Sequence, residues 1–188
     1  MLKIDKKELW AIPNLLGYFR IILIPIIVYL FSVAETKSNY YLITGLVIIS
    51  GISDFLDGQI ARRYKMITEW GKILDPFADK LTQLALLYCL AKRYFLLWYV
   101  LILFLIKEGL MLILGVFFLR KDRKMDGAMW YGKLSTAVIY VVMIILTVSS
   151  NLSKETVIFF ISLVGGTLIL AFVKYALEYR KMWHNLKI

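Results

Sequence analysis

The stretch Phe95-Leu-Leu-Trp-Tyr-Val-Leu-Ile-Leu-Phe-Leu-Ile-Lys107-Glu108-Gly-Leu-Met-Leu-Ile-Leu-Gly-Val-Phe-Phe-Leu119 decides the fold class. It is apolar throughout except for Lys107-Glu108. A helix needs about 20 predominantly apolar residues to cross a bilayer, and this run is long enough. Charges at membrane depth are costly and usually face a bundle interior or a water-filled cavity. The stretch therefore predicts a membrane-spanning helix with its charge pair turned inward.

Similar apolar runs recur along the chain. The sequence is 61% hydrophobic and 19% charged, whereas soluble domains are nearer half apolar and a quarter charged. We predict one all-α integral membrane domain, residues 1–188. It would comprise an interfacial segment 1–14, a six-helix bundle 15–178 and a basic cytoplasmic tail 179–188. The predicted spans are Leu15–Ala34, Tyr40–Ile60, Ile73–Leu90, Phe95–Leu119, Trp130–Val148 and Thr156–Leu177.

The first residues combine charged and apolar side chains. Lys3–Trp10 has the pattern of a short amphipathic helix on the membrane surface. Asn14 is a candidate cap for the first span. A basic start followed by an apolar run also fits a signal peptide. However, the run is long and contains Pro13, Arg20 and Pro25, and no small-residue cleavage site follows, so we favour a retained first span.

Lysine and arginine in the predicted loops are distributed unevenly. Fifteen fall on the side of the two termini and the loop 62–72, and four fall on the opposite side. Because cytoplasmic loops are enriched in basic residues, both termini and this loop are predicted to face the cytoplasm of a multi-pass protein in the cell membrane. The same bias, together with anionic lipid contact, explains the net charge of +10 without a nucleic-acid partner.

Two aspartate pairs flank the loop between the second and third predicted spans. The sequence reads Ser53-Asp54-Phe-Leu-Asp57-Gly-Gln-Ile-Ala-Arg62 and, eight residues later, Gly71-Lys-Ile-Leu-Asp75-Pro-Phe-Ala-Asp79. Residues three or four apart lie on one face of a helix, and a helical hairpin brings both pairs to the same depth. Four carboxylates this close would take up protons unless cations neutralise them. Oxygen ligands favour Mg²⁺ or Mn²⁺, and two such ions suit displacement at phosphorus.

Small residues beside the aspartates leave room for a ligand. Gly58 follows Asp57, Ala61 lies one turn further on, and Gly71 lies four before Asp75. Arg62 can pair with a phosphate oxygen or with one of the aspartates. The aspartates alone also suit a cation- or proton-coupled transporter, which remains the alternative from a different class.

The complete spacing is similar to that of the CDP-alcohol phosphotransferase family. The pattern is Asp-x-x-Asp-Gly-x-x-Ala-Arg, eight residues, then Gly-x-x-x-Asp-x-x-x-Asp. Eight residues of this chain occupy its fixed positions: Asp54, Asp57, Gly58, Ala61, Arg62, Gly71, Asp75 and Asp79. The six-span layout extends this resemblance over most of the chain.

The resemblance implies a reaction and residue roles. An acceptor alcohol attacks the β-phosphorus of CDP-diacylglycerol, and CMP leaves. The four aspartates hold two divalent ions, and Asp79 is the general base. The resemblance also implies a homodimer. The residues that it assigns to the CDP-lipid are Asp54, Asp57, Gly58, Ala61, Arg62, Gly71 and Asp75.

Other residues bear on the acceptor. Ile12-Pro13-Asn14-Leu15-Leu16, with Arg20, resembles phosphatidylglycerophosphate synthases, which use glycerol 3-phosphate. Arg20, Lys107 and Lys133 are candidate acceptor contacts. Those synthases often have Arg-Glu where this chain has Lys107-Glu108, and Gly-Lys-x-Lys-Thr where it has Gly132-Lys-Leu-Ser-Thr136. The stretch from Glu108 to Ile113 also resembles cardiolipin synthases, whose acceptor is phosphatidylglycerol, so two acceptors remain open.

Overall fold

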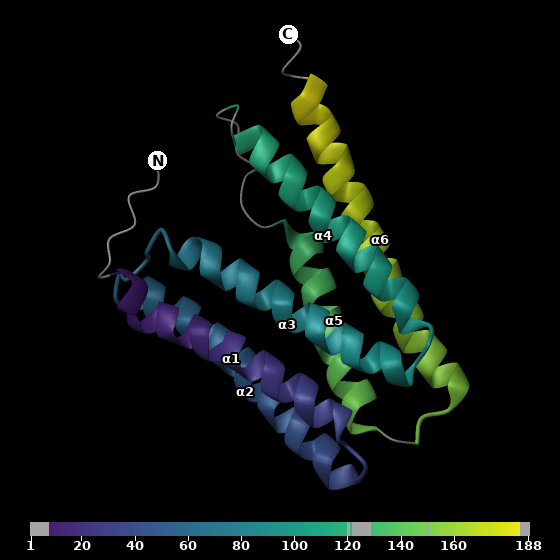
Figure 1. Ribbon diagram of the computed structural model, residues 1–188. Coiled ribbons are helices and arrows are strands. Elements are labelled where there is room, and N and C mark those ends of the chain that lie inside the picture. The colour runs from purple at the N-terminus through teal and green to yellow at the C-terminus, as the bar shows by residue number, and fades with distance from the viewer. Residues whose placement is uncertain (1–7, 120, 122–128, 150, 185–188) are drawn as a thin grey trace. The chain divides into compact units, whose positions relative to one another are not determined.

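The computed structural model describes residues 8–119, 121, 129–149 and 151–184. Within these residues the chain forms six α-helices and a short 3-10 helix, and it forms no strand (Figure 1). The elements are η1 (Glu8–Trp10), α1 (Ile12–Ser32), α2 (Lys37–Arg63), α3 (Gly71–Arg93), α4 (Leu97–Leu119), α5 (Trp130–Val148) and α6 (Lys154–His184).

Most of these helices have the length and composition of membrane spans. Five of the described helices qualify, and α3 is not among them. The first half of α3 carries Lys72, Asp75, Asp79 and Lys80, which lowers its hydropathy. Large apolar side chains are exposed on the other helices, for example Leu112 at 70%. Apolar exposure on this scale is typical of surfaces that face lipid, so the all-helical, multi-pass membrane prediction is confirmed at that level.

The predicted helix boundaries differ from the observed ones mainly at the ends. The fifth span, Trp130–Val148, agrees at both ends. The last helix was predicted to end at Leu177, but α6 continues to His184, so the first part of the predicted tail is helical. Lys154 at the start and Glu178, Arg180, Lys181 and His184 at the end are polar, and apolar content alone misses helix that continues into such sequence.

Two predictions concern the start of the chain. The prediction that Asn14 caps the first helix is wrong, because α1 begins at Ile12 after Ala11 and Asn14 lies inside it, buried. Of the predicted interfacial helix Lys3–Trp10, only Glu8–Trp10 is described, as a 3-10 turn. Residues 1–7, the basic residues Arg120, Arg123 and Lys124, and the end of the tail at 185–188 lie outside the described residues.

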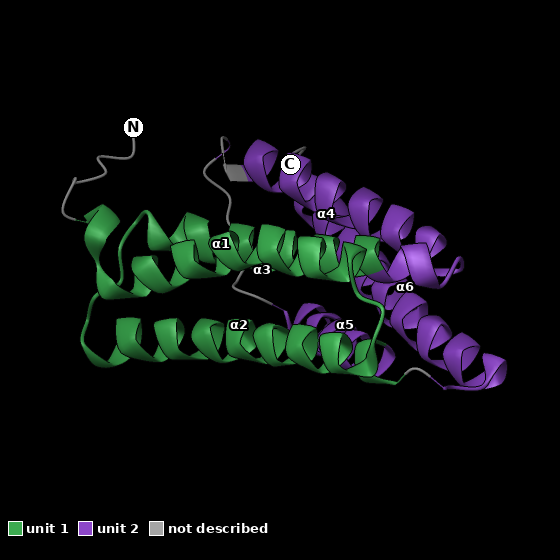
Figure 2. Ribbon diagram, turned by 60° about the horizontal axis from the view of Figure 1, so that its bottom comes forward, with its two compact units in different colours: residues 1–89, 147–150 green, residues 90–146, 151–188 purple. Residues whose placement is uncertain are grey.

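The chain divides into two compact units, which Figure 2 colours separately. Unit 1 comprises residues 1–89 and 147–150, and unit 2 comprises residues 90–146 and 151–188. In unit 1, α1 packs along α2 and η1 packs against the start of α1. Buried apolar side chains from both helices, such as Ile27 and Ile43, contribute to its core. The prediction of one domain across residues 1–188 stays a prediction.

In unit 2, α4 packs against α6. Aromatic side chains join these helices: the ring of Phe118 stacks on that of Tyr179, with centroids 5.4 Å apart. Tyr131 of α5 packs edge-on against Tyr175 of α6 at 4.7 Å. Unit 2 is therefore held by apolar and aromatic packing, whereas the polar contacts that concern the aspartates belong to unit 1.

A polar clasp joins the start of α1 to the loop before α3. The buried side-chain amide of Asn14 donates to the hydroxyl of Thr68 at 3.0 Å and also to the backbone carbonyl of Glu8. The Thr68 hydroxyl in turn accepts the first backbone N–H of α3, from Gly71, at 2.9 Å. Nearby, the Trp70 indole N–H donates to the Tyr18 hydroxyl at 2.6 Å. These contacts fix where α3 begins relative to α1.

Gly71 is the tightest point of this clasp. A Cβ atom at Gly71 would lie 2.7 Å from Asn14 Oδ1 and 2.9 Å from Thr68 Oγ1. Both atoms are held in place by the hydrogen bonds of the clasp, so neither moves aside without losing a bond. Glycine is therefore required here for close approach.

We expect Gly71→Ala to lower the free energy of unfolding by about 1–3 kcal/mol, the usual cost of overpacking a filled site. The measurement is thermal denaturation of purified protein in detergent. Gly51→Ala is the matched control, because a Cβ at Gly51 of α2 would meet no atom within 4 Å. Equal melting temperatures for the two variants would contradict the clasp.

Candidate functional site

The four predicted aspartates lie on two helices of unit 1. Asp54 and Asp57 occupy the last turns of α2, and Asp75 and Asp79 occupy the first turns of α3. Their side chains differ in exposure: 47% for Asp54, 2% for Asp57, 36% for Asp75 and 20% for Asp79. The site is thus open on the side of Asp54 and Asp75 and closed behind Asp57.

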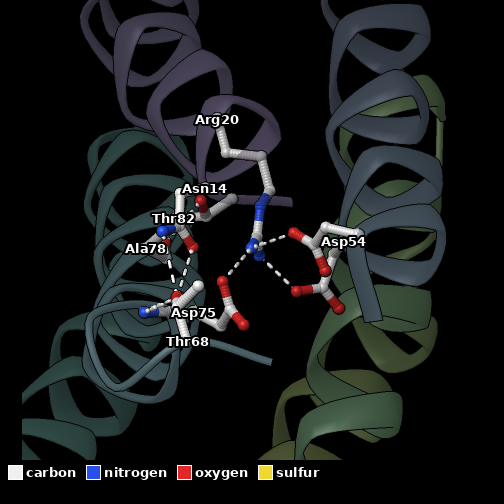
Figure 3. A network of polar contacts seen from close by, with 9 residues as sticks. Asn14, Arg20, Asp54, Thr68, Asp75, Ala78 and Thr82 are labelled. Atoms are coloured by element: carbon white, nitrogen blue, oxygen red, sulfur yellow. Dashed lines mark hydrogen bonds and ion pairs between the residues drawn. The ribbon is translucent and has the colours of Figure 1, made fainter. Parts of the chain in front are cut away.

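Arg20 of α1 connects the two aspartate pairs (Figure 3). One guanidinium nitrogen donates to Asp54, and the other donates to Asp57 Oδ2 at 2.6 Å and lies 3.6 Å from Asp75 Oδ1. The Arg20 side chain is only 2% exposed. Three of the four aspartates therefore meet around one buried cation, whereas Asp79 lies one turn further along α3.

A second glycine allows this approach. Gly17 lies one turn before Arg20 on α1, and a Cβ there would come within 2.8 Å of Leu74 Cδ2 and 3.7 Å of Asp75 Oδ1. The missing side chain lets α3 lie close to α1 at the level of Asp75. Gly17, the pairing of Arg20 with the aspartates and the Asn14 clasp were not predicted from the sequence, because each depends on contacts between distant segments.

The aspartates suit a divalent cation by chemistry. Their oxygens are the hard ligands that Mg²⁺ and Mn²⁺ prefer. As the side chains stand, no three carboxylate, imidazole or thiolate groups in the described residues converge as metal ligands, since the guanidinium lies among them. Yet Asp75 Oδ1 and Arg20 Nε are buried without a hydrogen-bond partner in the described part of the chain. Buried polar atoms are normally satisfied, so these two indicate a place for a further polar group.

Asp79 has its own polar neighbours one turn along α3. The side-chain amide of Gln83 donates to Asp79 Oδ2 at 2.8 Å, and Gln83 is fully buried. The ammonium of Lys80 lies 3.5 Å from the same oxygen and 3.4 Å from Gln83 Oε1. The contact between Gln83 and Asp79 was not predicted from the sequence. The position of Gln83 four residues after Asp79 is the signal that points to a contact on one helix face.

The other residues predicted for the CDP-lipid occupy the end of α2 and the start of α3. Arg62 is exposed, and its Nε donates to the backbone carbonyl of Gly58 at 2.9 Å rather than to a carboxylate. A Cβ at Gly58 would meet only Arg62 Nη2, at 3.7 Å. The space beside Gly58 is thus covered by a flexible side chain, and Ala61 is partly exposed one turn away. Contact of these residues with the CDP-lipid stays a prediction.

The candidate acceptor residues are divided between the units. Arg20 belongs to unit 1 and pairs with the aspartates. In unit 2, Lys107 of α4 is buried, its ammonium lies 2.6 Å from Glu108 Oε1, and it sits 5.8 Å above the Tyr175 ring. Lys133 is exposed near the start of α5. Lys107 thus forms an ion pair within unit 2, and the acceptor role of all three residues stays a prediction.

Comparison with known proteins adds independent information. The sequence model of a family described as CDP-alcohol phosphatidyltransferase matches residues 10–175. The chain is 41% identical over 80 residues to a Rickettsia prowazekii protein named CDP-diacylglycerol--glycerol-3-phosphate 3-phosphatidyltransferase. It is 38% identical over 87 residues to a Haemophilus influenzae protein of the same name. It is 34% identical over 116 residues to a Streptomyces coelicolor protein named cardiolipin synthase (CMP-forming).

These alignments cover only parts of the proteins compared. They include 43%, 46% and 60% of this chain, respectively. They cover 41%, 46% and 53% of the length of the three relatives, respectively. The chain therefore spans about half the length, or less, of these curated relatives. The family match extends much further along the chain than any of these alignments.

Proposed function

The chain belongs to the CDP-alcohol phosphatidyltransferase family, as the match over residues 10–175 shows, and we propose that it transfers a phosphatidyl group from CDP-diacylglycerol to an alcohol and releases CMP. The observation that carries this proposal is the meeting of Asp54, Asp57 and Asp75 around one buried cation. A site that gathers carboxylates from two helices around a single guanidinium keeps an excess of negative charge, which is suited to holding a cation-bound diphosphate.

The four aspartates are proposed to hold two Mg²⁺ or Mn²⁺ ions. When bound, such ions neutralise diphosphate oxygens and stabilise the charge that develops on the leaving CMP. Asp57 would be the innermost ligand, because it is buried, while Asp54 and Asp75 would face the entering substrate with their exposed edges. Gly58, Ala61, Arg62 and Gly71 are proposed to line the position of the cytidine diphosphate part.

Asp79 is proposed as the general base. It would take the proton of the acceptor hydroxyl while that oxygen forms a bond to the β-phosphorus and the bond from this phosphorus to the CMP oxygen breaks. Gln83 donates to Asp79 Oδ2 and thereby limits rotation of the carboxylate. A base whose orientation is fixed before the reaction loses less entropy in the transition state.

Glycerol 3-phosphate is the proposed acceptor. Two of the relatives described above carry that compound in their names, and the chain has the Ile12-Pro13-Asn14-Leu15-Leu16 stretch with Arg20. Arg20 of unit 1 is proposed to contact the phosphate of this acceptor, and Lys107 and Lys133 of unit 2 stay candidate contacts. Both termini and the site are proposed to face the cytoplasm, where CMP and a soluble acceptor are exchanged, and the protein is proposed to form a homodimer.

Phosphatidylglycerol is the second candidate acceptor, which would make the protein a cardiolipin synthase. Ser135 favours it, because phosphatidylglycerophosphate synthases tend to have lysine at this position. In this chain Ser135 is 1% exposed, and its hydroxyl has no hydrogen-bond partner in the described residues. A buried neutral hydroxyl is less suited than lysine to binding a phosphate monoester, and the relative from Streptomyces coelicolor is named for this second activity.

The deciding experiment measures CMP release by purified protein supplied with CDP-diacylglycerol and Mg²⁺. We expect release that depends on glycerol 3-phosphate and stops when EDTA removes the metal. Release only with phosphatidylglycerol would replace the proposed acceptor. No release with either acceptor would reject the enzyme proposal and favour the cation- or proton-coupled transporter.

We expect Asp57→Asn to abolish CMP release with little loss of folded protein. Asparagine keeps an oxygen that accepts from Arg20, but it removes the negative charge that a divalent ion requires. Activity is read in the same assay, and melting temperature in detergent checks the fold. A folded variant with wild-type turnover would contradict the ligand role.

We expect Gln83→Leu to lower kcat by about 10- to 100-fold with little change in the KM for CDP-diacylglycerol, the range typical of losing a residue that orients a site ligand. Leucine fills similar volume without donating to Asp79. Thr82→Val is the matched control, because the Thr82 hydroxyl donates to the backbone carbonyl of Ala78. An equal loss of activity in Gln83→Leu and Thr82→Val would contradict the orienting role of Gln83.

A further inference from the structure

Arg20 lies among the carboxylates that are proposed to bind divalent ions. Its two terminal nitrogens contact Asp54 and Asp57, and one of them also lies 3.6 Å from Asp75 Oδ1. These are three of the four proposed metal ligands, and they come from both helices of the site. Its Nε atom and Asp75 Oδ1 are buried with no hydrogen-bond partner in the described residues, so the contact is close but incomplete.

The charges explain why such a contact forms and why it must change. Three carboxylates around one guanidinium leave an excess of negative charge, so the cluster still attracts cations. Two divalent ions would reverse that balance, and the guanidinium would then lie beside like charge. Repulsion between like charges about 4 Å apart is large where the side chains are buried away from water, because the effective dielectric constant is low there. Mg²⁺ ligands lie at about 2.1 Å from the ion, so an ion among these carboxylates competes with the guanidinium for the same oxygens.

We propose that Arg20 is an internal counter-cation: it holds the aspartates together before divalent ions bind, and the ions bind by displacing its guanidinium. This rests on the proposed metal site. A displaced guanidinium that stays buried needs another anion, and a substrate phosphate is the anion that the proposed reaction supplies. Metal and phosphate-bearing substrate should therefore bind cooperatively, because the substrate offers Arg20 a new partner.

The test measures Mn²⁺ binding without any substrate, by the loss of the free-ion electron paramagnetic resonance signal, in purified protein in detergent. We expect Arg20→Gln to tighten Mn²⁺ binding about 10-fold or more, since the competing charge is gone. We also expect a lower melting temperature for the metal-free variant and a larger rise in melting temperature on adding Mn²⁺. A merely structural arginine would lower the melting temperature of both forms alike and would leave Mn²⁺ affinity unchanged or weaker.

Two further variants sharpen the result. Arg63→Gln removes an exposed positive charge from the same end of α2, so it controls for general electrostatics and should alter Mn²⁺ affinity by about 2-fold at most. Arg20→Lys keeps the charge but cannot span Asp54 and Asp57 with a planar fork, so it should tighten Mn²⁺ binding less than glutamine does. If Arg20→Gln does not fold, Arg20→Lys decides: Mn²⁺ affinity equal to or weaker than wild type overturns the proposal.

The outcomes separate this proposal from the proposed reaction. Tighter Mn²⁺ binding in Arg20→Gln without CMP release by the wild type would support the counter-cation and reject the transfer reaction. CMP release by the wild type with unchanged Mn²⁺ affinity in Arg20→Gln would keep the reaction and reject the counter-cation. Failure of the wild type and both Arg20 variants to bind Mn²⁺ would reject the counter-cation together with the metal site.

Discussion

The ion pairs between Arg20 and the aspartates are the constraint on which unit 1 depends. A buried carboxylate such as Asp57 is strongly unfavourable without a partner, and a guanidinium that is 2% exposed has the same requirement. Neither charge reaches water, so α1 and α2 must meet where these groups are paired, and Asp75 of α3 lies 3.6 Å from the same guanidinium. The packing around them follows from that requirement: Gly17 lets α3 approach α1, and the Asn14 clasp fixes where α3 begins.

Pairing charge inside a membrane protein has a functional consequence. Well-packed apolar side chains would stabilise the contact between these helices as much as, or more than, an arginine paired with aspartates does. The polar arrangement keeps Asp54 and Asp75 partly exposed beside a buried Asp57, so the cluster is both assembled and open on one side. That combination suits a site whose positive charge is supplied from outside the chain. The same three carboxylates therefore serve the packing of unit 1 and the proposed function.

The sequence predicts those parts of the structure that depend on local pattern. Apolar length is a property of one segment, so the six helices were placed well and Trp130–Val148 agrees at both ends. Spacing on a helix is also local, which is why the two aspartate pairs could be assigned to one face each. Helix ends in polar sequence were predicted less well, as α6 shows by continuing to His184.

Contacts between distant segments could not be predicted from apolar length or from helical spacing. Arg20 and Asp57 are 37 residues apart, and Asn14 and Thr68 are 54 apart, so no spacing rule connects them. A lone arginine in an apolar run indicates a charge that needs a partner, but it does not say which one. In the folded chain the partners of Arg20 are the aspartates, so Arg20 is more than a candidate for binding substrate phosphate. It becomes part of the charge balance of the aspartates, and any cation that binds them must first compete with it.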